Sequence, residues 1–285
     1  MGTVADKLNY LQGTKEAIKS ALIEKGVSVA DSDTFRSYAD KISGIKTTEM
    51  EDALVTRNFT SYTNDRVTDI GSGAFYGASK LTTVYFPKVK TLGTYAFTGS
   101  GLTRVTEAEF PNLINPGSGF REANITEVDL PKITGNTGQF YGCKKLVRVN
   151  MPNATILGSF NLCSALVNVN MPLLTSINAN GFRGCKALEM LDFQGSPTIN
   201  AYSMLDNPAF KILILRGSNV ATLGATTAFS FTSTQSPDLY IYVPRALVDS
   251  YKSAQNWSTI SDRIRALEDY TVDGTTTGAF DKSKI

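Results

Sequence analysis

The chain has 285 residues and a net charge of +2, with 42% hydrophobic and 19% charged residues, the composition of a globular protein large enough to bury a core. So small a net charge does not indicate a nucleic-acid or anionic-membrane partner. No run approaches 18 consecutive apolar residues, so no insertion into a membrane is expected.

The absence of histidine excludes Ser-His-Asp and Cys-His catalytic machinery and zinc sites that contain histidine. The three cysteines lack CxxC spacing, so they indicate neither a disulfide framework nor a zinc cluster. One acidic group resembles a metal site in composition: it consists of Glu107, Glu109 and Asp129. The spacing of these residues matches no known ligand pattern. We interpret them as surface charge and expect no metal, no cofactor and no catalytic residue. An enzyme that uses a pair of carboxylates or a lysine is not excluded at this point.

Residues 1–45 are predicted to form a helical module. A helix is expected over residues 4–25 because apolar residues recur near a helical period and Gly26 is a natural stop; these residues are Leu8, Leu11, Ile18 and Leu22. A second short helix is expected after Ser32 or Asp33 as the N-cap. Its apolar face would carry Phe35, Tyr38 and Ile42. The first residues are rich in charge and lack the apolar segment of a secretory signal.

Residues 46–65 are expected to be a linker and an N-terminal cap. The stretch from Leu54 to Ile70, LVTRNFTSYTNDRVTDI, has the character of a strand pair or a partial coil that covers the first repeat.

A repeat occupies residues 66–244. Six copies carry an anchor phenylalanine, and direct subtraction of the numbers gives spacings of 20 to 23 residues; the anchors are Phe75, Phe97, Phe120, Phe140, Phe160 and Phe182. Each anchor is followed by an aliphatic residue five or six positions later and by another three positions after that. Four copies then end in an apolar residue and proline. Two further, weaker copies follow the six.

This pattern predicts a solenoid, in which each coil buries its apolar side only by stacking on its neighbours. The segment L-x-x-V-x-(F/L/M)-P alternates with period two and therefore predicts a short strand with one face inward. Proline ends the strand where a ladder donor is no longer needed. The anchor phenylalanine is expected to fill the interior of each coil.

The three cysteines, Cys143, Cys163 and Cys185, each lie three residues after an anchor phenylalanine. The same position is Ala78, Ser100 or Ala123 in earlier copies. A position that accepts alanine or serine is a small buried packing position, where a free cysteine behaves as a small hydrophobe.

Residues 245–269 are expected to form a helical cap of two short helices over the last coil, since an uncapped repeat would expose its apolar face and sheet edge. The residues directed at that coil would be Val248, Tyr251, Trp257, Ile260, Ile264 and Leu267. Residues 270–285 are polar and rich in glycine and threonine, and they are expected to be a mobile tail.

The period and the strand pattern identify leucine-rich repeats, and the form IGxxAFxGCxxLxxVxxP resembles the BspA-like subclass, first known from bacterial surface proteins. The first copy matches at Ile70, Gly71, Ala74, Phe75, Gly77, Leu81, Val84 and Pro87. This resemblance implies an α/β right-handed solenoid with a parallel β-sheet on one side and turns or short helices on the other. The corner glycine is replaced by Glu122 in one copy and by Leu162 in another.

The segment from Lys7 to Ile42 resembles the N-terminal module of tail-associated minor structural proteins of bacteriophages of Gram-positive gut bacteria. The LxYLxxTKxAIKxAI-like helix, Lys25-Gly26-Val27 and the DTFRxYAxKI stretch that begins at Asp33 carry the likeness. The resemblance implies a virion or prophage origin and a docking role for this end, on a phage tail or baseplate protein. The alternative is a generic two-helix N-terminal cap.

Strand alternation predicts two outward columns on the sheet. The first is Thr83, Arg104, Glu127, Arg148, Asn168, Met190, Ile212 and Tyr240; the second is Tyr85, Thr106, Asp129, Asn150, Asn170, Asp192, Ile214 and Tyr242. Because adjacent strands lie roughly 4.8 Å apart, Arg104, Glu127 and Arg148 should form a charge ladder. A polar strip should run from Asp129 through Asn150 and Asn170 to Asp192. The candidate partner-binding residues are Tyr85, Arg104, Glu127, Asp129, Arg148, Asn150, Asn168, Asn170, Asp192, Tyr240 and Tyr242. A solvated face without a ligand is the alternative.

These observations favour a non-enzymatic binding or adhesion protein, tail-associated in a phage or encoded by a prophage. It would recognise a host-surface protein or glycan through the sheet face and be located in the virion after synthesis in the bacterial cytoplasm. One alternative is a BspA-like adhesin of the bacterial cell surface. Another is a hydrolase of surface polymers, which would need a carboxylate pair in a cleft. The ligand, the host and the oligomeric state stay open.

Overall fold

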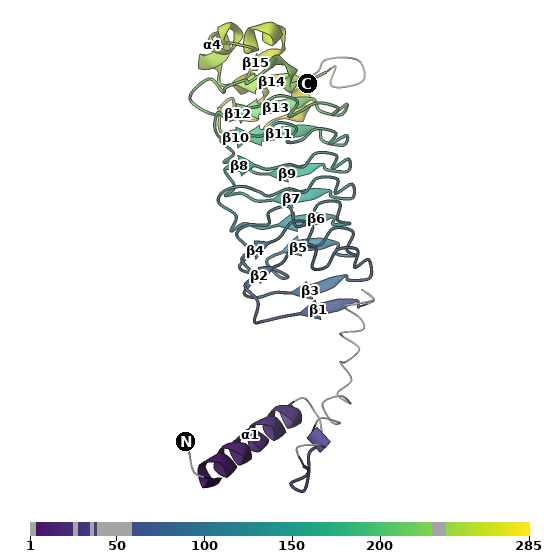
Figure 1. Ribbon diagram of the computed structural model, residues 1–285. Coiled ribbons are helices and arrows are strands. Elements are labelled where there is room, and N and C mark those ends of the chain that lie inside the picture. The colour runs from purple at the N-terminus through teal and green to yellow at the C-terminus, as the bar shows by residue number, and fades with distance from the viewer. Residues whose placement is uncertain (1–3, 25–27, 35–36, 39–58, 230–237) are drawn as a thin grey trace. The chain divides into compact units, whose positions relative to one another are not determined.

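The computed structural model of the protein describes residues 4–24, 28–34, 37–38, 59–229 and 238–285 (Figure 1). The chain divides into two compact units, Met1–Thr56 and Arg57–Ile285. Each unit is described below by itself.

The first unit contains one long helix, α1, from Val4 to Glu24, where the helical period had predicted it. Leu22 is buried, whereas Leu8 and Leu11 are exposed, so within the described residues only the C-terminal end of the expected apolar face is covered. Tyr38 is also buried, with the Lys15 ammonium 6.0 Å from the centre of its ring. An ion pair between Lys19 and Asp31 joins the helix to the segment that follows.

The start of the second predicted helix differs from the expectation. Thr34 Oγ1 accepts a hydrogen bond from Ser37 N at 3.3 Å, and Ser37 Oγ accepts one from Thr34 N at 3.1 Å. This reciprocal pair of hydrogen bonds is the pattern of a capping box. Thr34 is therefore the N-cap residue, in place of Ser32 or Asp33. Phe35 and Ile42, expected on the apolar face of this helix, and most of the predicted linker lie outside the described residues.

The second unit is a solenoid of short parallel strands in two stacks (Figure 1). The larger stack contains β1 (Ser61–Thr63), β3 (Thr83–Tyr85), β5 (Arg104–Thr106), β6 (Glu127–Asp129), β7 (Arg148–Asn150), β9 (Asn168–Asn170), β11 (Met190–Phe193), β13 (Ile212–Leu215), β14 (Tyr240–Val243) and β15 (Ile264–Ala266). The smaller stack contains β2 (Asp69–Ile70), β4 (Thr91–Leu92), β8 (Ile156–Leu157), β10 (Ser176–Ile177) and β12 (Thr198–Ile199). The predicted solenoid with a parallel sheet face is confirmed.

Strand pairing in the larger stack follows the repeat. One ladder runs β5-β6-β7-β9 and another runs β11-β13-β14-β15, while β1 pairs with β3. Arg104 lies opposite Glu127 and Glu127 opposite Arg148, which is the register that the repeat predicted. Because β1 pairs in parallel with β3, the segment before the first repeat is itself a coil that covers the repeat. β9 and β11 end their respective ladders and are not paired with each other.

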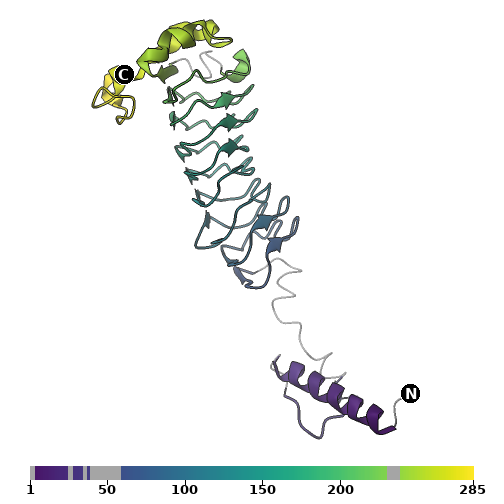
Figure 2. The same cartoon turned by 90° about the vertical axis from the view of Figure 1, so that its left-hand side faces the viewer.

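A column of anchor phenylalanines fills the solenoid, as the repeat predicted. Each ring stacks nearly parallel on the next, with centroids 5.0 Å apart for Phe75 and Phe97 and 5.2 Å apart for Phe140 and Phe160. The strand residues directed inward, such as Val128 and Val149, are also buried. Burial of these apolar groups provides the main stabilisation of the coils. Figure 2 shows the coils edge on, one above another.

The corner after each anchor requires a left-handed backbone. Gly77, Gly142 and Gly184 have φ of 69°, 71° and 71°, a region that glycine enters without a steric penalty. Glu122 and Leu162, which replace this glycine in their copies, have φ of 54° and 63°. The stacked coils thus impose the glycine conformation on two residues that are strained in it.

The cysteine column is buried, as expected for packing positions, and its three residues form no disulfide. Each thiol also donates a hydrogen bond to the carbonyl of an anchor phenylalanine in the preceding coil: Cys143 Sγ to Phe120 O at 3.0 Å, Cys163 Sγ to Phe140 O at 3.1 Å and Cys185 Sγ to Phe160 O at 3.2 Å. Asn207 continues the series, since its Nδ2 donates to Phe182 O at 3.0 Å. These side chains therefore join adjacent coils as well as filling space.

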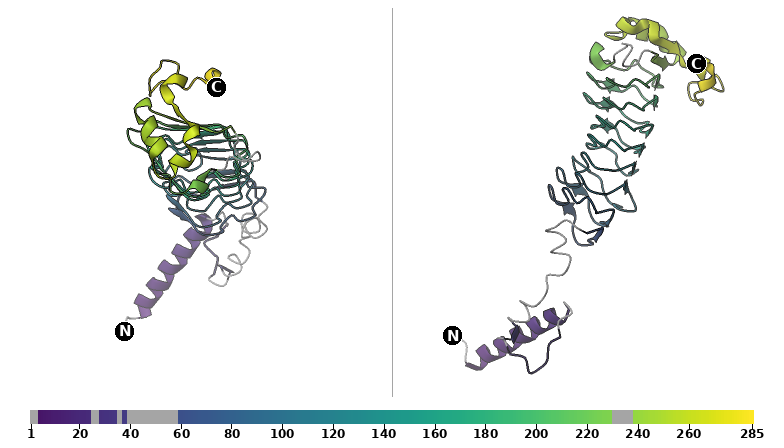
Figure 3. Two further views of the ribbon diagram at one scale, coloured as in Figure 1. Left: turned by 90° about the horizontal axis from the view of Figure 1, so that it is seen from above. Right: turned by 90° about the vertical axis from the view of Figure 1, so that its right-hand side faces the viewer.

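The C-terminal cap is partly helical. It contains the helix α4 (Val248–Ser253) and the 3-10 helices η2 (Arg245–Leu247), η3 (Trp257–Arg263) and η4 (Leu267–Tyr270), which cover the end of the solenoid in Figure 3. Tyr251 and Trp257 are buried in the core. Residues 264–266 were expected to be helical, and this expectation is wrong: they form β15, which pairs with β14 and continues the sheet by one strand.

Residues 270–285, which were expected to be mobile, are folded onto the sheet. Val272 N donates to Ala279 O at 2.9 Å and Asp281 N to Tyr270 O at 2.7 Å, and a short 3-10 helix, η5, spans Lys282–Lys284. The tail packs on a second apolar cluster on the outer face of the sheet, which contains Ile212, Ile214, Tyr242 and Leu267. The expectation fails because composition alone does not reveal this cluster as a docking partner.

The strained corner makes a direct prediction about stability. Glu122→Gly should stabilise the protein by roughly 0.5–1 kcal/mol, because glycine removes the left-handed strain, which costs about 1–2 kcal/mol, and this gain is partly offset by the higher conformational entropy of glycine in the unfolded chain. Lys145→Gly is the control, since Lys145 is also an exposed residue of a turn but is not among the residues with positive φ. Urea unfolding should show the control losing stability. A loss with Glu122→Gly would contradict the strain.

The covered tyrosine makes a prediction about pH. Burial raises the pKa of Tyr242 to about 12, so its contribution to stability is complete below the unfolded pKa of about 10 and is lost as the pH rises through 12. Between pH 8 and pH 11 the wild type should therefore lose about 1 kcal/mol more than Tyr242→Phe. Urea unfolding at both pH values measures the difference.

Phe280→Ala should shrink this difference, since it removes a ring that covers Tyr242. An unchanged pH dependence in the Phe280→Ala protein would show that the tail does not shield the phenol.

Candidate functional site

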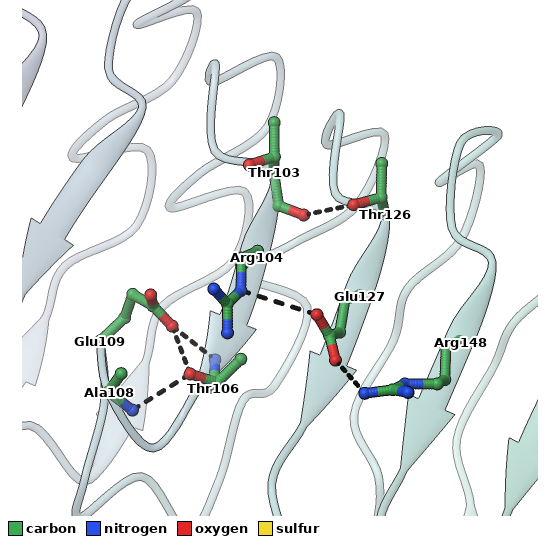
Figure 4. A network of polar contacts seen from close by, with 8 residues as sticks. All are labelled: Thr103, Arg104, Thr106, Ala108, Glu109, Thr126, Glu127 and Arg148. Atoms are coloured by element: carbon green, nitrogen blue, oxygen red, sulfur yellow. Dashed lines mark hydrogen bonds and ion pairs between the residues drawn. The ribbon is translucent and has the colours of Figure 1, made fainter.

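The outer face of β5, β6 and β7 carries the predicted charge ladder. Glu127 lies between two arginines: its Oε1 is 2.5 Å from Arg148 Nη2, and its Oε2 is 3.6 Å from Arg104 Nε. Figure 4 shows the three side chains in one row across the strands. Each arginine is more than half exposed. Exposed pairs of this kind contribute only about 0–1 kcal/mol to stability, so the row is chiefly a patterned surface that presents charge to solvent.

The second row is a chain of amides beside the charges. Asn150 Nδ2 donates to Asp129 Oδ1 at 2.7 Å, and Asn170 Nδ2 donates to Asn150 Oδ1 at 2.6 Å. The predicted polar strip therefore exists from β6 to β9. All three side chains are oriented by these bonds, which fixes the positions of the donors and acceptors that remain open to a partner.

Asp192 does not continue this strip. Its two oxygens accept from Arg216, at 2.7 Å from Nε and 2.8 Å from Nη2. Arg216 also donates from Nη1 to the backbone carbonyls of Thr276 and Gly278 in the tail. Asp192 therefore binds the guanidinium group that holds the tail. The prediction that it belongs to the open polar strip is wrong.

The aromatic candidates have different surroundings. Tyr85 is exposed, and Tyr240 is half-buried under the guanidinium groups of Arg263 and Arg265, whose central carbons lie 5.6 and 4.4 Å from the ring centre. Tyr242 was predicted to be an outward contact residue, but only 2% of its surface is exposed. The rings of Tyr270 and Phe280 cover it, with centroids at 4.8 and 4.7 Å.

The tail therefore divides the face into two parts. Ile212 and Ile214, both on the predicted outward columns, are buried with Tyr242, so the β13–β14 part is covered. The open part is the face of β3 to β9, and the candidates on it are exposed or half-buried: Tyr85, Arg104, Glu127, Asp129, Arg148, Asn150, Asn168 and Asn170. The face available to a partner is smaller and more polar than the sequence columns suggested.

A groove of about 500 Å³ lies where the ladder is interrupted between β9 and β11. The residues that line it include Val149, Val169, Asn168, Asn170 and Met190. Val169 is half-buried although Val128 and Val149, at the same repeat position, are 0% and 1% exposed. The anchor rings of these two coils, Phe160 and Phe182, have centroids 6.0 Å apart, compared with 5.2 Å for the preceding pair.

Sequence reasoning missed this groove. Val169 fits the inward pattern of the repeat, and nothing in the pattern indicates that β9 and β11 do not pair. The groove also contains Glu189 and Lys282, which belong to a repeat and to the tail respectively, 93 positions apart.

The acidic group Glu107, Glu109 and Asp129 is divided among separate roles. Glu109 Oε2 accepts from Thr106 N at 2.9 Å and from Thr106 Oγ1 at 2.6 Å (Figure 4), and Glu107 lies 3.3 Å from Lys132 Nζ. Across the described ranges there is no set of three or more cysteine, aspartate or glutamate side chains placed to hold a metal ion.

Nucleophilic chemistry at the thiols is disfavoured by burial. Burial raises the pKa of the Cys163 thiol well above its ordinary value and raises the pKa of the Cys185 thiol to about 12. Both thiols are therefore protonated near neutral pH, and the thiolate is the reactive form.

Among the described residues, no helix has the length and apolar character needed to cross a membrane.

Comparison with solved structures gives several leucine-rich-repeat proteins of low identity. A leucine-rich repeat protein from Bacteroides ovatus is 16% identical with a TM-score of 0.49, covering 73% of this chain and 54% of that one. A leucine rich cell surface protein from Faecalibacterium prausnitzii is 15% identical with a TM-score of 0.39, covering 73% of this chain and 64% of that one. The leucine-rich repeat protein of T. pallidum is 18% identical with a TM-score of 0.41, covering 70% and 85%.

This chain thus spans about half the length of the Bacteroides protein. No curated protein matches its sequence. The BspA type leucine rich repeat region matches this chain over residues 55–159 and 136–240. The matched span contains the anchor phenylalanines, the left-handed corners and the parallel strands described above, and it covers more than half of the chain. The protein belongs to the family of BspA-type leucine-rich-repeat proteins.

Proposed function

We propose that this is a non-enzymatic binding protein that contacts a host-surface protein or glycan through the open part of its sheet face. The observation that carries this is the fixed polar pattern on β5 to β9, where the Arg104–Glu127–Arg148 row runs beside the Asp129–Asn150–Asn170 row. These rows present oriented charges and amides at strand spacing without contributing much to folding. Extended solenoid faces of this kind bind partners by many contacts at once.

The N-terminal unit supplies the second half of the proposal. Residues 1–45 would attach the protein to a phage tail or baseplate protein, making it a component of the virion. The exposed apolar side chains Val4, Leu8 and Leu11 on α1 support a docking role, since a helix with uncovered apolar residues gains stability by packing on a partner. A BspA-like adhesin of the bacterial cell surface is the alternative, favoured by the repeat family itself.

A hydrolase of surface polymers is the third possibility, and the groove bears on it. Glu189 and Asp192 both line the groove, so the face is not free of clefts. However, both oxygens of Asp192 accept from Arg216, and Glu189 is 3.4 Å from Lys282 Nζ. A carboxylate whose oxygens are engaged in an ion pair is a poor general acid or base. Binding is therefore the better supported function.

The binding face can be tested by charge reversal. Arg148→Glu combined with Asn150→Ala should weaken attachment to host cells by tenfold or more, because it places a carboxylate beside Glu127 and breaks the amide chain. Flow cytometry of the labelled protein on candidate host strains measures attachment. Lys144→Ala, an exposed turn residue of the same coil, is the matched control and should bind as the wild type does. Equal binding by all three proteins would remove the face from the proposal.

The location of the protein gives a separate test. Purified phage particles that carry this gene should contain the protein at a fixed ratio to other tail proteins, as measured by quantitative mass spectrometry. A chain that lacks residues 1–45 should be absent from the particles. Particles without the full-length protein, together with its recovery from the bacterial surface, would favour the adhesin.

A further inference from the structure

We propose that the groove between β9 and β11 binds an uncharged saccharide of the partner surface. This inference rests on the proposed binding function and specifies which chemistry one part of the face recognises. It starts from the interruption of the sheet, since residues of β9 and β11, which end two separate ladders, line the groove. Its volume of about 500 Å³ falls within the roughly 300–1,000 Å³ of small-ligand pockets.

The charged side chains around the groove already have ionic partners within the chain. Arg148 Nη2 is 2.5 Å from Glu127, Lys282 Nζ is 3.4 Å from Glu189, and Asp192 is held by both guanidinium donors of Arg216. An ionic ligand would have to compete with each of these partners, whereas an uncharged ligand leaves them in place. Electrostatics therefore favours a neutral molecule.

The groups still open in the groove suit hydroxyls. Asn170 is the last amide of its row and donates to Asn150, which leaves its carbonyl oxygen as an acceptor. Within the part of the chain that the structure describes, the amide of Asn168 makes no side-chain hydrogen bond, so it offers both a donor and an acceptor. A hydroxyl group is itself a donor and an acceptor. The apolar side chains of Val167 and Val169, which also line the groove and are not fully buried, suit the C–H face of a sugar ring.

The same sheet provides a comparison with peptide binding. The sheet does hold one peptide, its own tail. Arg216 binds the carbonyls of Thr276 and Gly278, and the ring of Tyr242 packs against the rings of Tyr270 and Phe280. The described lining of the groove contains no aromatic ring, and its one guanidinium, on Arg148, is paired with Glu127. The groove lacks the features with which this protein holds a peptide, which favours a sugar.

A glycan array that contains neutral and acidic oligosaccharides, followed by titration calorimetry of the hits, tests the inference with the full chain. We expect one or more neutral glycans to bind, and Asn168→Leu to weaken that binding about tenfold through loss of its hydrogen bonds. Asn219→Leu is the control: Asn219 is an exposed asparagine outside the groove and should bind normally. Circular dichroism should show both variants folded.

Binding of acidic glycans only, binding of no glycan, or neutral binding that Asn168→Leu leaves intact would each overturn the inference. These outcomes are distinct from failure of the proposed function. Host-cell attachment that is lost with Arg148→Glu but unaffected by Asn168→Leu would leave the binding face in place and reject only the sugar. Competition of attachment by a Thr- and Gly-rich peptide, and by no sugar, would assign the groove to a peptide.

Discussion

Stacking of one coil on the next is the constraint on which the rest of this structure depends. No coil can bury its own apolar side, so the anchor phenylalanines form a continuous column of rings with centroids 5.0 to 6.0 Å apart. That column sets the spacing of the strands, and the strand spacing aligns equivalent side chains on the outer face. The left-handed corners at Glu122 and Leu162 show how strong this constraint is, since both residues adopt a backbone conformation that is unfavourable for any residue with a side chain.

The same constraint explains how much the sequence could predict. A period of 20 to 23 residues with fixed offsets determines which residue lies opposite which, and the pairing of Arg104, Glu127 and Arg148 follows from it. The inward positions of Val128 and Cys143 follow from it as well. These predictions succeed because they depend only on local alternation and on repetition, and both patterns can be read directly from the amino-acid sequence.

The failures concern contacts between segments that the repeat does not relate. Arg216 reaches carbonyls of the tail 60 and 62 residues away, and Phe280 covers Tyr242 through an apolar cluster on the outer face. A polar, glycine-rich composition gives no sign of either contact. The groove is similarly hidden, because Val169 satisfies the inward pattern while the pairing of one strand with the next depends on packing of the whole solenoid.

The tail and the groove together determine what the sheet face can present. At β13 and β14 the outward columns become Ile212, Ile214 and Tyr242, which would form an apolar patch next to the exposed edge of the solenoid. Covering that patch with Tyr270 and Phe280 removes a surface prone to self-association, and extending the sheet with β15 moves its edge outward. The tail also places the Lys282 ammonium 3.4 Å from the Glu189 carboxylate beside the groove. One segment thus covers the apolar end of the face and adds a lysine beside the groove, so the polar rows on β5 to β9 remain as the open surface of the sheet.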